Sequence, residues 1–321
     1  MHFNSNNVVK NEYIMRTLIF PGQGSQSVGM ASEFYNNFNS VKKIFSLADE
    51  ILKYKISKTI LEGPEETLKL TENAQPAIML VSYSIMHVIK SEFGINLKCK
   101  YLAGHSLGEY SALVCANSLS FEDALLLLQK RGKFMQEAVP VGQGSMLAVL
   151  GCEIKKLNEI ISNLKEDGVC EIANDNADGQ VIISGHSEKI KKLQSFLKIN
   201  KIKSIALPVS APFHCSLMKQ ASEKMKFEIE STIFNKPQID IINNVTASIE
   251  TSPVNIKDLL VRQIFSPVKW RETILKMEKD GITDFIEIGP GKVLSGLVKR
   301  IIKNALTINI NSVEDIKKFL K

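Results

Sequence analysis

Short apolar runs alternate along the chain with longer stretches of helical periodicity. An apolar run over Thr17–Phe20 ends in a Pro-Gly-Gln-Gly sequence, which is typical of a buried strand that feeds a tight turn. Apolar residues then repeat at helical spacing over 41–52 and over Ala77–Ile89. Tyr101–Ala103 is the next strand candidate, and a second sharp turn into a helix follows it. This order predicts an α/β fold.

The pattern changes between Ser145 and Val209. Four strand-like runs and two helical stretches follow one another there in the order βαββαβ, which is that of a ferredoxin-like unit. We expect residues 142–209 to form a small subdomain inserted into the larger domain. The predicted strands are Met146–Leu150, Val169–Ala173, Gln180–Ser184 and Lys203–Val209, and the predicted helices are Glu153–Lys165 and Glu188–Leu197.

Alternating helices and strands return after this insertion. They are helix Leu217–Ser231, strand Ile239–Ile242, helices Ile256–Ile264 and Arg271–Lys279, and strand Asp284–Ile288 with a helix from Lys292. The alternation predicts a mostly parallel sheet covered on both faces, built from residues 16–141 and 210–321. Residues 1–15 carry no export signal, and we interpret them as a disordered extension or as the product of an early start codon.

Composition narrows the classes of function. The net charge of +6 is spread without a Lys/Arg block, which argues against a nucleic-acid partner and leaves an acidic partner open. No apolar run approaches the length of a membrane span. The five cysteines form no CxxC pair and have no histidine at ligand spacing, so we expect free thiols in a reducing compartment and no metal site.

Gly104-His105-Ser106-Leu107-Gly108 fits the G-x-S-x-G nucleophile elbow and lies between a predicted strand and a predicted helix, Glu109–Ala116. A strained turn of this kind holds the serine above the sheet, and the helix that follows directs free N–H groups at a reacting carbonyl oxygen. The alternative is an ordinary glycine-rich turn.

Arg131 lies on the apolar stripe of the helix that begins at Ser120, four residues after Leu127 and four before Met135. It should therefore point inward. A buried guanidinium without an anion costs several kcal/mol, so something negative should meet it. Two structural explanations are an ion pair within the protein and a side chain that reaches back to the surface near the helix end. The functional alternative is a substrate carboxylate that accepts two hydrogen bonds from the planar guanidinium.

His214 is the best candidate for a general base. It lies in a proline-bounded loop at the return from the insertion to the main domain, where catalytic groups concentrate. His2, His87 and His186 carry no motif. No carboxylate follows at an obvious position for a third member of a triad, and a structural histidine remains the alternative.

Taken together, these motifs resemble the bacterial malonyl-CoA:acyl carrier protein transacylases from Arg16 to the C-terminus. The matching stretches are FPGQGSQSVGM (20–30), AQPA (74–77), GHSLGEYSAL (104–113), KRGKFMQEAVP (130–140), FHCSLM (213–218), RQIFSPVKW (262–270) and IGPGKVLSGLVKR (288–300). The resemblance implies a hydrolase-like α/β core whose cleft is covered by the ferredoxin-like subdomain.

The resemblance also implies roles for individual residues. Ser106 would be the acylated nucleophile and His214 its base, and Arg131 would bind the malonyl carboxylate. The backbone N–H groups of Gln23 and Leu107 would bind the oxyanion.

Four further positions follow from the same resemblance. Gln75 would line the pocket, and the main-chain carbonyl of Gln263 would orient the histidine in place of a carboxylate. Asn174 matches the cleft-facing asparagine of the family, with Asn176 as the alternative. Phe213 would favour malonyl over branched extender units.

The implied activity is the ping-pong transfer of a malonyl group from malonyl-CoA to the phosphopantetheine thiol of holo acyl carrier protein, for fatty acid synthesis. We expect a cytoplasmic monomer without a resident cofactor. Lys299, Arg300 and Lys303 are either a docking cluster for the acidic carrier or a solvated helix face. The competing functions are a serine esterase or phospholipase, and a non-catalytic partner in a larger synthase complex.

Overall fold

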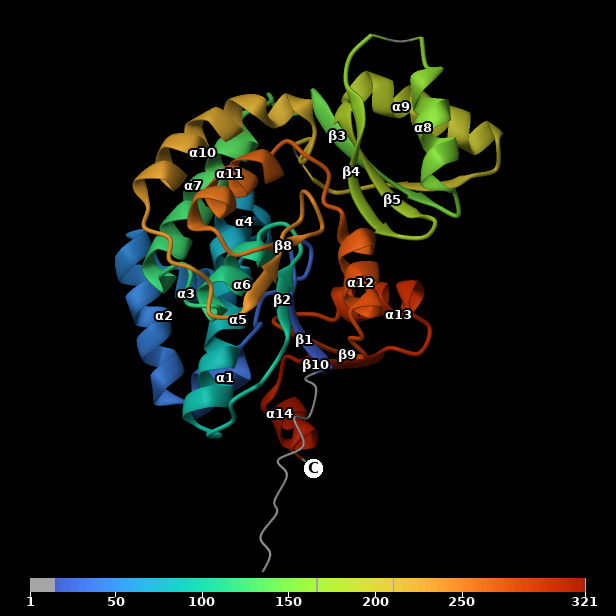
Figure 1. Ribbon diagram of the computed structural model, residues 1–321. Helices are drawn as coiled ribbons and strands as arrows, with labels where there is room; N and C mark the ends of the chain where they lie inside the picture. The colour runs from blue at the N-terminus through green and yellow to red at the C-terminus, as the bar shows by residue number, and fades with distance from the viewer. Residues whose placement is uncertain (1–14, 166, 210, 321) are drawn as a thin grey trace, which may run out of the picture.

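A six-stranded sheet forms the centre of the larger part of the molecule (Figure 1). The computed structural model describes residues 15–165, 167–209 and 211–320. The strand order is β10-β9-β1-β2-β7-β8, in which the first five strands pair in parallel and β8 pairs antiparallel with β7 at the edge. The mostly parallel sheet is thus confirmed. Its strands are β1 (Arg16–Phe20), β2 (Tyr101–Gly104), β7 (Asp240–Ile242), β8 (Ile249–Glu250), β9 (Asp284–Ile288) and β10 (Leu306–Ile310).

Helices cover both faces of this sheet because its strands are apolar on both sides. Leu18 and Phe20 of β1 join the main core, whereas Ile19 between them packs with Trp270 and Ile274 on the other face. The helices are α1 (Ser32–Asn37), α2 (Asn39–Leu52), α3 (Ile56–Glu62), α4 (Glu65–Lys69), α5 (Thr71–Ser91), α6 (Gly108–Cys115), α7 (Phe121–Glu137), α10 (Lys219–Ser231), α11 (Pro253–Gln263), α12 (Trp270–Lys279), α13 (Val293–Ile301) and α14 (Val313–Phe319).

A second sheet of four antiparallel strands stands beside the first, with α8 and α9 packed on it (Figure 1). Its strand order is β4-β5-β3-β6, and it has a separate apolar cluster that includes Leu147, Leu157 and Leu193. The elements follow the predicted ferredoxin-like order βαββαβ, which is confirmed. They are β3 (Gly144–Leu150), α8 (Ile154–Ser162), β4 (Cys170–Ala177), β5 (Gln180–His186), α9 (Ser187–Ile199) and β6 (Lys203–Ala206).

Strand β4 joins the small sheet to the segment that leads into α12. The N–H of Val268 donates to the carbonyl of Ala173 (2.8 Å), and the N–H of Asp175 donates to the carbonyl of Val268 (3.0 Å). Arg271 of α12 adds an ion pair with the buried Asp175 carboxylate, at 2.9 Å. These bonds hold β4 against the larger part of the molecule.

Several predicted element bounds were wrong. The helix predicted over Ala77–Ile89 begins at Thr71, so Pro76 lies inside α5. A proline in a helix interior removes one hydrogen bond, and here the burial of nearly every neighbouring side chain outweighs that loss. The strand predicted over Lys203–Val209 ends at Ala206. The short elements α1, α3, α4, α14, β8 and β10 were not predicted.

The proposed N-terminal extension falls mostly outside the described residues, which begin at Met15. The carbonyl of Met15 accepts hydrogen bonds from the N–H groups of Thr283 and Asp284, so this residue already belongs to the ordered part of the chain. The prediction that placed Met15 in the extension was therefore wrong.

Three further features concern the described residues. None of the helices there combines the length and apolarity needed to cross a lipid bilayer. Within the same residues, no group of three or more His, Cys, Asp or Glu side chains could hold a metal ion. All five cysteines are unpaired thiols.

Candidate active site

Ser106 stands on a strained turn between β2 and α6. Its φ of 53° lies in the left-handed region, which is costly for a residue with a side chain. A Cβ atom on Gly104 would lie 1.9 Å from the carbonyl group of Gly108, and one on Gly108 would lie 2.2 Å from the carbonyl oxygen of Phe20. Both glycines are therefore required for the tight approach of strand and helix, as expected of a nucleophile elbow.

The side chain of Asn244, which follows β7, supports this elbow. Its Oδ1 atom accepts a hydrogen bond from the N–H of Ser106 (2.7 Å), and its Nδ2 atom donates to the carbonyl of Gly104 (2.7 Å). The asparagine is fully buried. These two bonds hold the strained residue from both sides.

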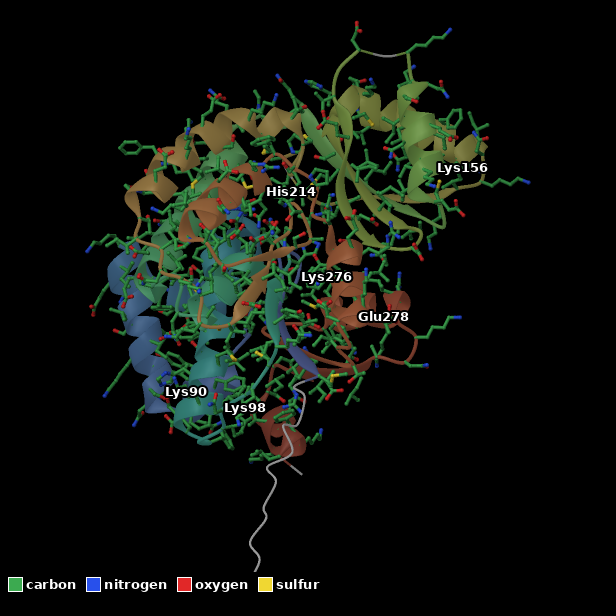
Figure 2. The ribbon with its side chains drawn as sticks, in the orientation of Figure 1. Lys90, Lys98, Lys156, His214, Lys276 and Glu278 are labelled. Atoms are coloured by element: carbon green, nitrogen blue, oxygen red, sulfur yellow. The ribbon has the colours of Figure 1, made fainter. Side chains whose placement is uncertain are left out.

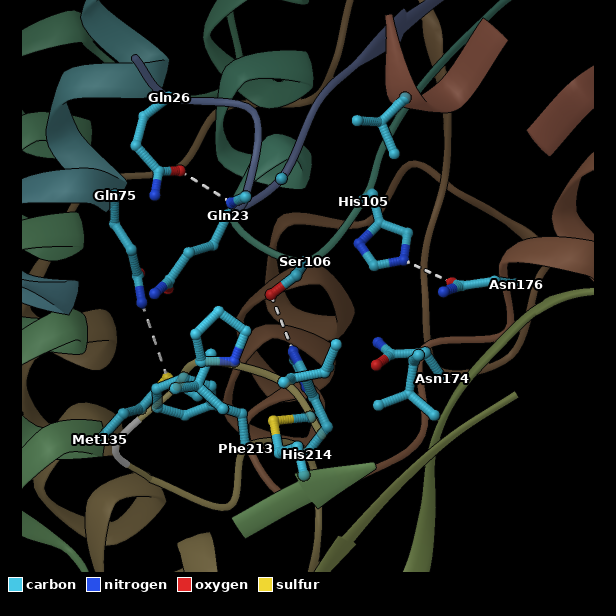
Figure 3. A pocket seen from close by; sticks show the side chains of 18 of the residues that line it. Gln23, Gln26, Gln75, His105, Ser106, Met135, Asn174, Asn176, Phe213 and His214 are labelled. Carbon is cyan, nitrogen blue, oxygen red and sulfur yellow. Dashed lines mark hydrogen bonds between the residues drawn. The ribbon is translucent and has the colours of Figure 1, made fainter. Parts of the chain in front are cut away.

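His214 lies directly opposite the serine, and Figure 2 shows it where the helices of the larger part meet the small sheet. Its Nε2 atom is 2.8 Å from Ser106 Oγ (Figure 3). Its Nδ1 atom is 2.8 Å from the main-chain carbonyl oxygen of Gln263. A carbonyl oxygen can only accept, so Nδ1 carries the proton and Nε2 presents its lone pair to the serine hydroxyl.

The protonation state of His214 follows from its surroundings. Burial, together with the positive charge of Arg131, lowers the pKa of the imidazole to about 3. The ring is neutral at ordinary pH, which is the form that can accept a proton from the serine.

The segment that carries His214 is also bonded to the small sheet. The N–H and hydroxyl of Ser216 both donate to the carboxylate of Glu171 in β4, at 2.8 and 2.6 Å.

Arg131 points inward from α7, as its place on the apolar stripe predicted, and is only 1% exposed. Its Nη1 atom donates to Gln75 Oε1 (2.7 Å), and its Nη2 atom donates to Gln263 Oε1 (2.8 Å) and Ser106 Oγ (3.2 Å). Within the described residues it forms no ion pair. Of the alternatives left open by the sequence, a structural ion pair and a side chain that reaches the surface are therefore wrong, because three neutral oxygen atoms contact the buried guanidinium.

A cavity of about 480 Å³ opens onto these groups. Of the residues predicted for the site, it is lined by Gln23, Gln75, Ser106, Arg131, Asn174, Phe213 and His214. Leu107 and Gln263 are not among the lining residues, and Gln263 contacts His214 and Arg131 through its main-chain carbonyl and its side chain. The structure thus gathers the predicted residues around one hollow, although they come from distant parts of the chain.

The two candidate asparagines of β4 differ in their contacts (Figure 3). The side-chain oxygen of Asn176 is 2.9 Å from the Nε2 atom of His105. The side chain of Asn174 makes no hydrogen bond within the described residues and lines the cavity. Both asparagines line the cavity, and Asn174 is the one whose side-chain oxygen is not already engaged by another described residue.

The first glycine-rich turn lies beside the elbow. The N–H of His105 donates to the carbonyl of Phe20 (3.0 Å), and a Cβ atom on Gly22 would come within 2.6 Å of the His105 carbonyl oxygen. Neither the N–H of Gln23 nor that of Leu107 has an acceptor among residues 15–165, 167–209 and 211–320. Two unused backbone donors therefore lie near the serine, as an oxyanion hole requires.

Comparison with known proteins shows the family to which this chain belongs. The acyl transferase domain family matches residues 17–318. The malonyl CoA-acyl carrier protein transacylase of Bacillus subtilis (strain 168) is 44% identical over 301 residues, which cover 93% of this chain and 94% of the relative. The chain belongs to the malonyl CoA-acyl carrier protein transacylase family.

Solved structures of such transacylases share the fold. The acyl-carrier-protein S-malonyltransferase of Bartonella henselae superposes with a TM-score of 0.92 at 41% identity, covering 95% of this chain and 98% of that one. A malonyl-transacylase in complex with its holo type II PKS acyl-carrier protein superposes with a TM-score of 0.91 at 37% identity, covering 94% of this chain and 98% of that one.

Sequence reasoning about this transacylase missed two buried polar residues, Glu109 and Asn244. The Oε2 atom of Glu109 accepts from the N–H of Asn244 (3.0 Å) and from Nε2 of Gln263 (2.7 Å). A carboxyl group directly after the second elbow glycine, on an otherwise apolar helix, was a signal that could have found Glu109. The only signal for Asn244 was a pair of asparagines after a predicted strand.

The basic residues Lys299, Arg300 and Lys303 are exposed at and beyond the end of α13. Nη1 of Arg300 donates to the side chain of Gln180, a residue that lines the cavity. The cluster thus lies near the rim of the transacylase cavity, and its role in carrier docking stays a prediction.

Proposed function

We propose that this chain transfers a malonyl group from malonyl-CoA to the phosphopantetheine thiol of acyl carrier protein, through a malonyl ester of Ser106. One observation carries the proposal: the Ser106 hydroxyl lies 2.8 Å from the lone-pair nitrogen of His214 and 3.2 Å from the buried Arg131 guanidinium. A nucleophile, its base and a cation suited to a carboxylate share one cavity. The function supplies extender units for fatty acid synthesis.

In the first half-reaction, His214 Nε2 takes the hydroxyl proton as Ser106 Oγ attacks the thioester carbonyl carbon. The oxyanion that forms accepts hydrogen bonds from the N–H groups of Gln23 and Leu107. The C–S bond then breaks, and the CoA thiolate takes the proton from His214 as it leaves, which returns the imidazole to its neutral form. The main-chain carbonyl of Gln263 stabilises the imidazolium because it accepts from Nδ1 throughout.

In the second half-reaction, the carrier thiol gives its proton to His214 Nε2 as its sulfur attacks the carbonyl carbon of the malonyl-serine ester, and an oxyanion forms in the same place. The C–O bond to Ser106 then breaks, and His214 returns the proton to Ser106 Oγ. Arg131 binds the free carboxylate in both steps, and this contact replaces the neutral oxygen atoms of Gln75 and Gln263 by an anion. Asn174 and Gln75 line the acyl pocket. Phe213 lines it too, and its bulk near the α-carbon favours malonyl over branched analogues.

The remaining features of the proposal follow from the same site. The substrates are malonyl-CoA and holo acyl carrier protein, and the chain's own groups supply the nucleophile, base and oxyanion donors, so no resident cofactor is included. Five unpaired thiols suit a reducing compartment, and we place the enzyme in the cytoplasm. We assign residues 16–141 and 210–321 to the catalytic domain and 142–209 to the inserted subdomain.

The test is intact-protein mass analysis after incubation with malonyl-CoA, with and without holo carrier protein. We expect a single malonyl adduct that is absent from Ser106→Ala, and its loss to the carrier when the carrier is added. Release of free malonate without a carrier would indicate an esterase-type hydrolase instead. No adduct on the folded wild-type protein would contradict the proposal and favour a non-catalytic partner.

A further inference from the structure

Arg131 has an unusual electrostatic environment for a buried cation. Three neutral oxygen atoms accept hydrogen bonds from its Nη1 and Nη2 atoms, and its Nε atom has no partner within the described residues. Desolvating a guanidinium is costly, and neutral dipoles offset only part of that cost. A second contribution must come from a negative charge further away.

Glu109 is the carboxyl group placed to provide it. The residue is 2% exposed and belongs to the helix that carries the elbow. The amide of Gln263 links it to Arg131: Nε2 of this amide donates to Glu109 Oε2 (2.7 Å), while Oε1 accepts from Arg131 Nη2 (2.8 Å). The carboxylate thus stands one side chain away from the guanidinium.

The same Oε2 atom of Glu109 accepts from the N–H of Asn244, so both of its hydrogen bonds converge on one oxygen. A proton could therefore sit on Oε1 without breaking either bond. The carboxyl group can gain or lose its charge while its partners stay in place.

The other titratable groups around Glu109 are neutral. Tyr110, its neighbour on α6, has a pKa raised to about 12 by burial. His214 on its loop and His105 in the elbow have pKa values lowered by burial. Arg131 of α7 is the charged group that faces Glu109, and Asn244 and Gln263 are its uncharged partners. The buried site thus contains one cation and one titratable anion.

We propose that Glu109 is the counter-charge of Arg131 in the empty site and that it competes electrostatically with the malonyl carboxylate for this cation. The inference rests on the proposed function, because it assumes that Arg131 binds that carboxylate. When the substrate carboxylate arrives, two anions face one guanidinium in a medium of low polarity, and protonation of Glu109 relieves their repulsion. Malonyl binding is then linked to the uptake of one proton.

The direction of the pH effect follows. Burial raises the pKa of Glu109 to about 7, against smaller opposing effects of its hydrogen bonds and of Arg131. Below this value the competing charge is already neutralised, so malonyl-CoA should bind more tightly. Above it the carboxylate is ionised, so malonyl-CoA should bind more weakly.

The experiment measures the single-turnover rate of Ser106 acylation against malonyl-CoA concentration, for the wild type and Glu109→Gln. The half-saturating concentration of the wild type should fall about three- to tenfold between pH 8 and pH 6. Glu109→Gln keeps an oxygen acceptor for Asn244 and Gln263 but carries no charge. At both pH values it should show the low half-saturating concentration that the wild type has at pH 6.

Acetyl-CoA is the matched control because it shares the CoA moiety and lacks the carboxylate. Its half-saturating concentration should be the same at both pH values and in both proteins. A wild-type value for malonyl-CoA that does not change with pH, or a pH dependence that survives in Glu109→Gln, would overturn the inference. Absence of any malonyl adduct on the wild type would instead count against the proposed function.

Discussion

The Nη2 atom of Arg131 in α7 donates a hydrogen bond to Oγ of Ser106 on the turn before α6, although the two residues lie 25 positions apart. The contact brings a permanent positive charge to the point where an acyl group would be attached. A short diacid unit esterified at Oγ therefore has its second carboxylate within reach of the guanidinium. This relationship leads to predictions about selectivity, pH and stability.

Arg131→Ala should abolish the preference for malonyl-CoA. Loss of a buried charge partner costs about 3–5 kcal/mol, which corresponds to a loss of about two to four orders of magnitude in kcat/KM. Acetyl-CoA, which has no carboxylate, should be affected far less. The measurement is the ratio of kcat/KM for the two thioesters. Lys133→Ala, an exposed position on the same helix, is the control and should keep the wild-type ratio.

The acylation rate at saturating malonyl-CoA should not change between about pH 5 and 8. The neutral imidazole of His214 is the form that accepts the serine proton. Its pKa is lowered to about 3 from the ordinary value of 6.5, so this form is lost only when the pH falls through about 3. Rapid-quench mass analysis across this range measures the rate. A loss of rate centred near pH 6.5 would show that the histidine titrates as an exposed one does.

The elbow glycine Gly108 should not tolerate a methyl group. Its Cβ atom would lie 2.2 Å from a backbone oxygen, so Gly108→Ala should lower the free energy of unfolding by about 3 kcal/mol or more. Gly296→Ala is the matched control. Nothing lies within 4 Å of that position in α13, and the change should stabilise by about 0.5–1 kcal/mol. Urea denaturation of both variants measures the difference, and equal effects would contradict the argument.

Arg271→Ala should weaken the attachment of β4. The Asp175 carboxylate, whose side chain is 5% exposed, would lose the donors from Nε (3.0 Å) and Nη2 (2.9 Å) of Arg271, at a cost of about 2–3 kcal/mol. Amide hydrogen exchange should rise in β4, and the KM for malonyl-CoA should increase because Asn174 lies on this strand. Arg262→Ala removes an exposed pair with Asp258 and should change stability by about 0.5 kcal/mol or less. Equal rates of amide hydrogen exchange in β4 of both variants would contradict the role of the Arg271–Asp175 ion pair.

Local patterns in the sequence were enough to predict much of the fold. Alternation of apolar runs and helical periodicity predicted the parallel sheet and the βαββαβ insertion. This worked because the spacing of apolar residues within each element determines which of its faces is buried. The same reasoning failed at Thr71–Ser91, where Pro76 suggested a later helix start, and at short elements such as β8, whose two residues carry too little periodicity to be recognised.

The sequence by itself determined that Ser106 would stand on a strained turn and that Arg131 would face inward, because both depend on neighbours within one or two turns of the chain. Only the tertiary structure decided which side chains contact Ser106 and Arg131. Neutral oxygens of Gln75 and Gln263 contact the guanidinium, and of the two asparagines that line the cavity Asn176 shares a hydrogen bond with His105. The partners of Arg131 are 56 and 132 residues away from it, and contacts of that range arise from packing, which no local pattern records.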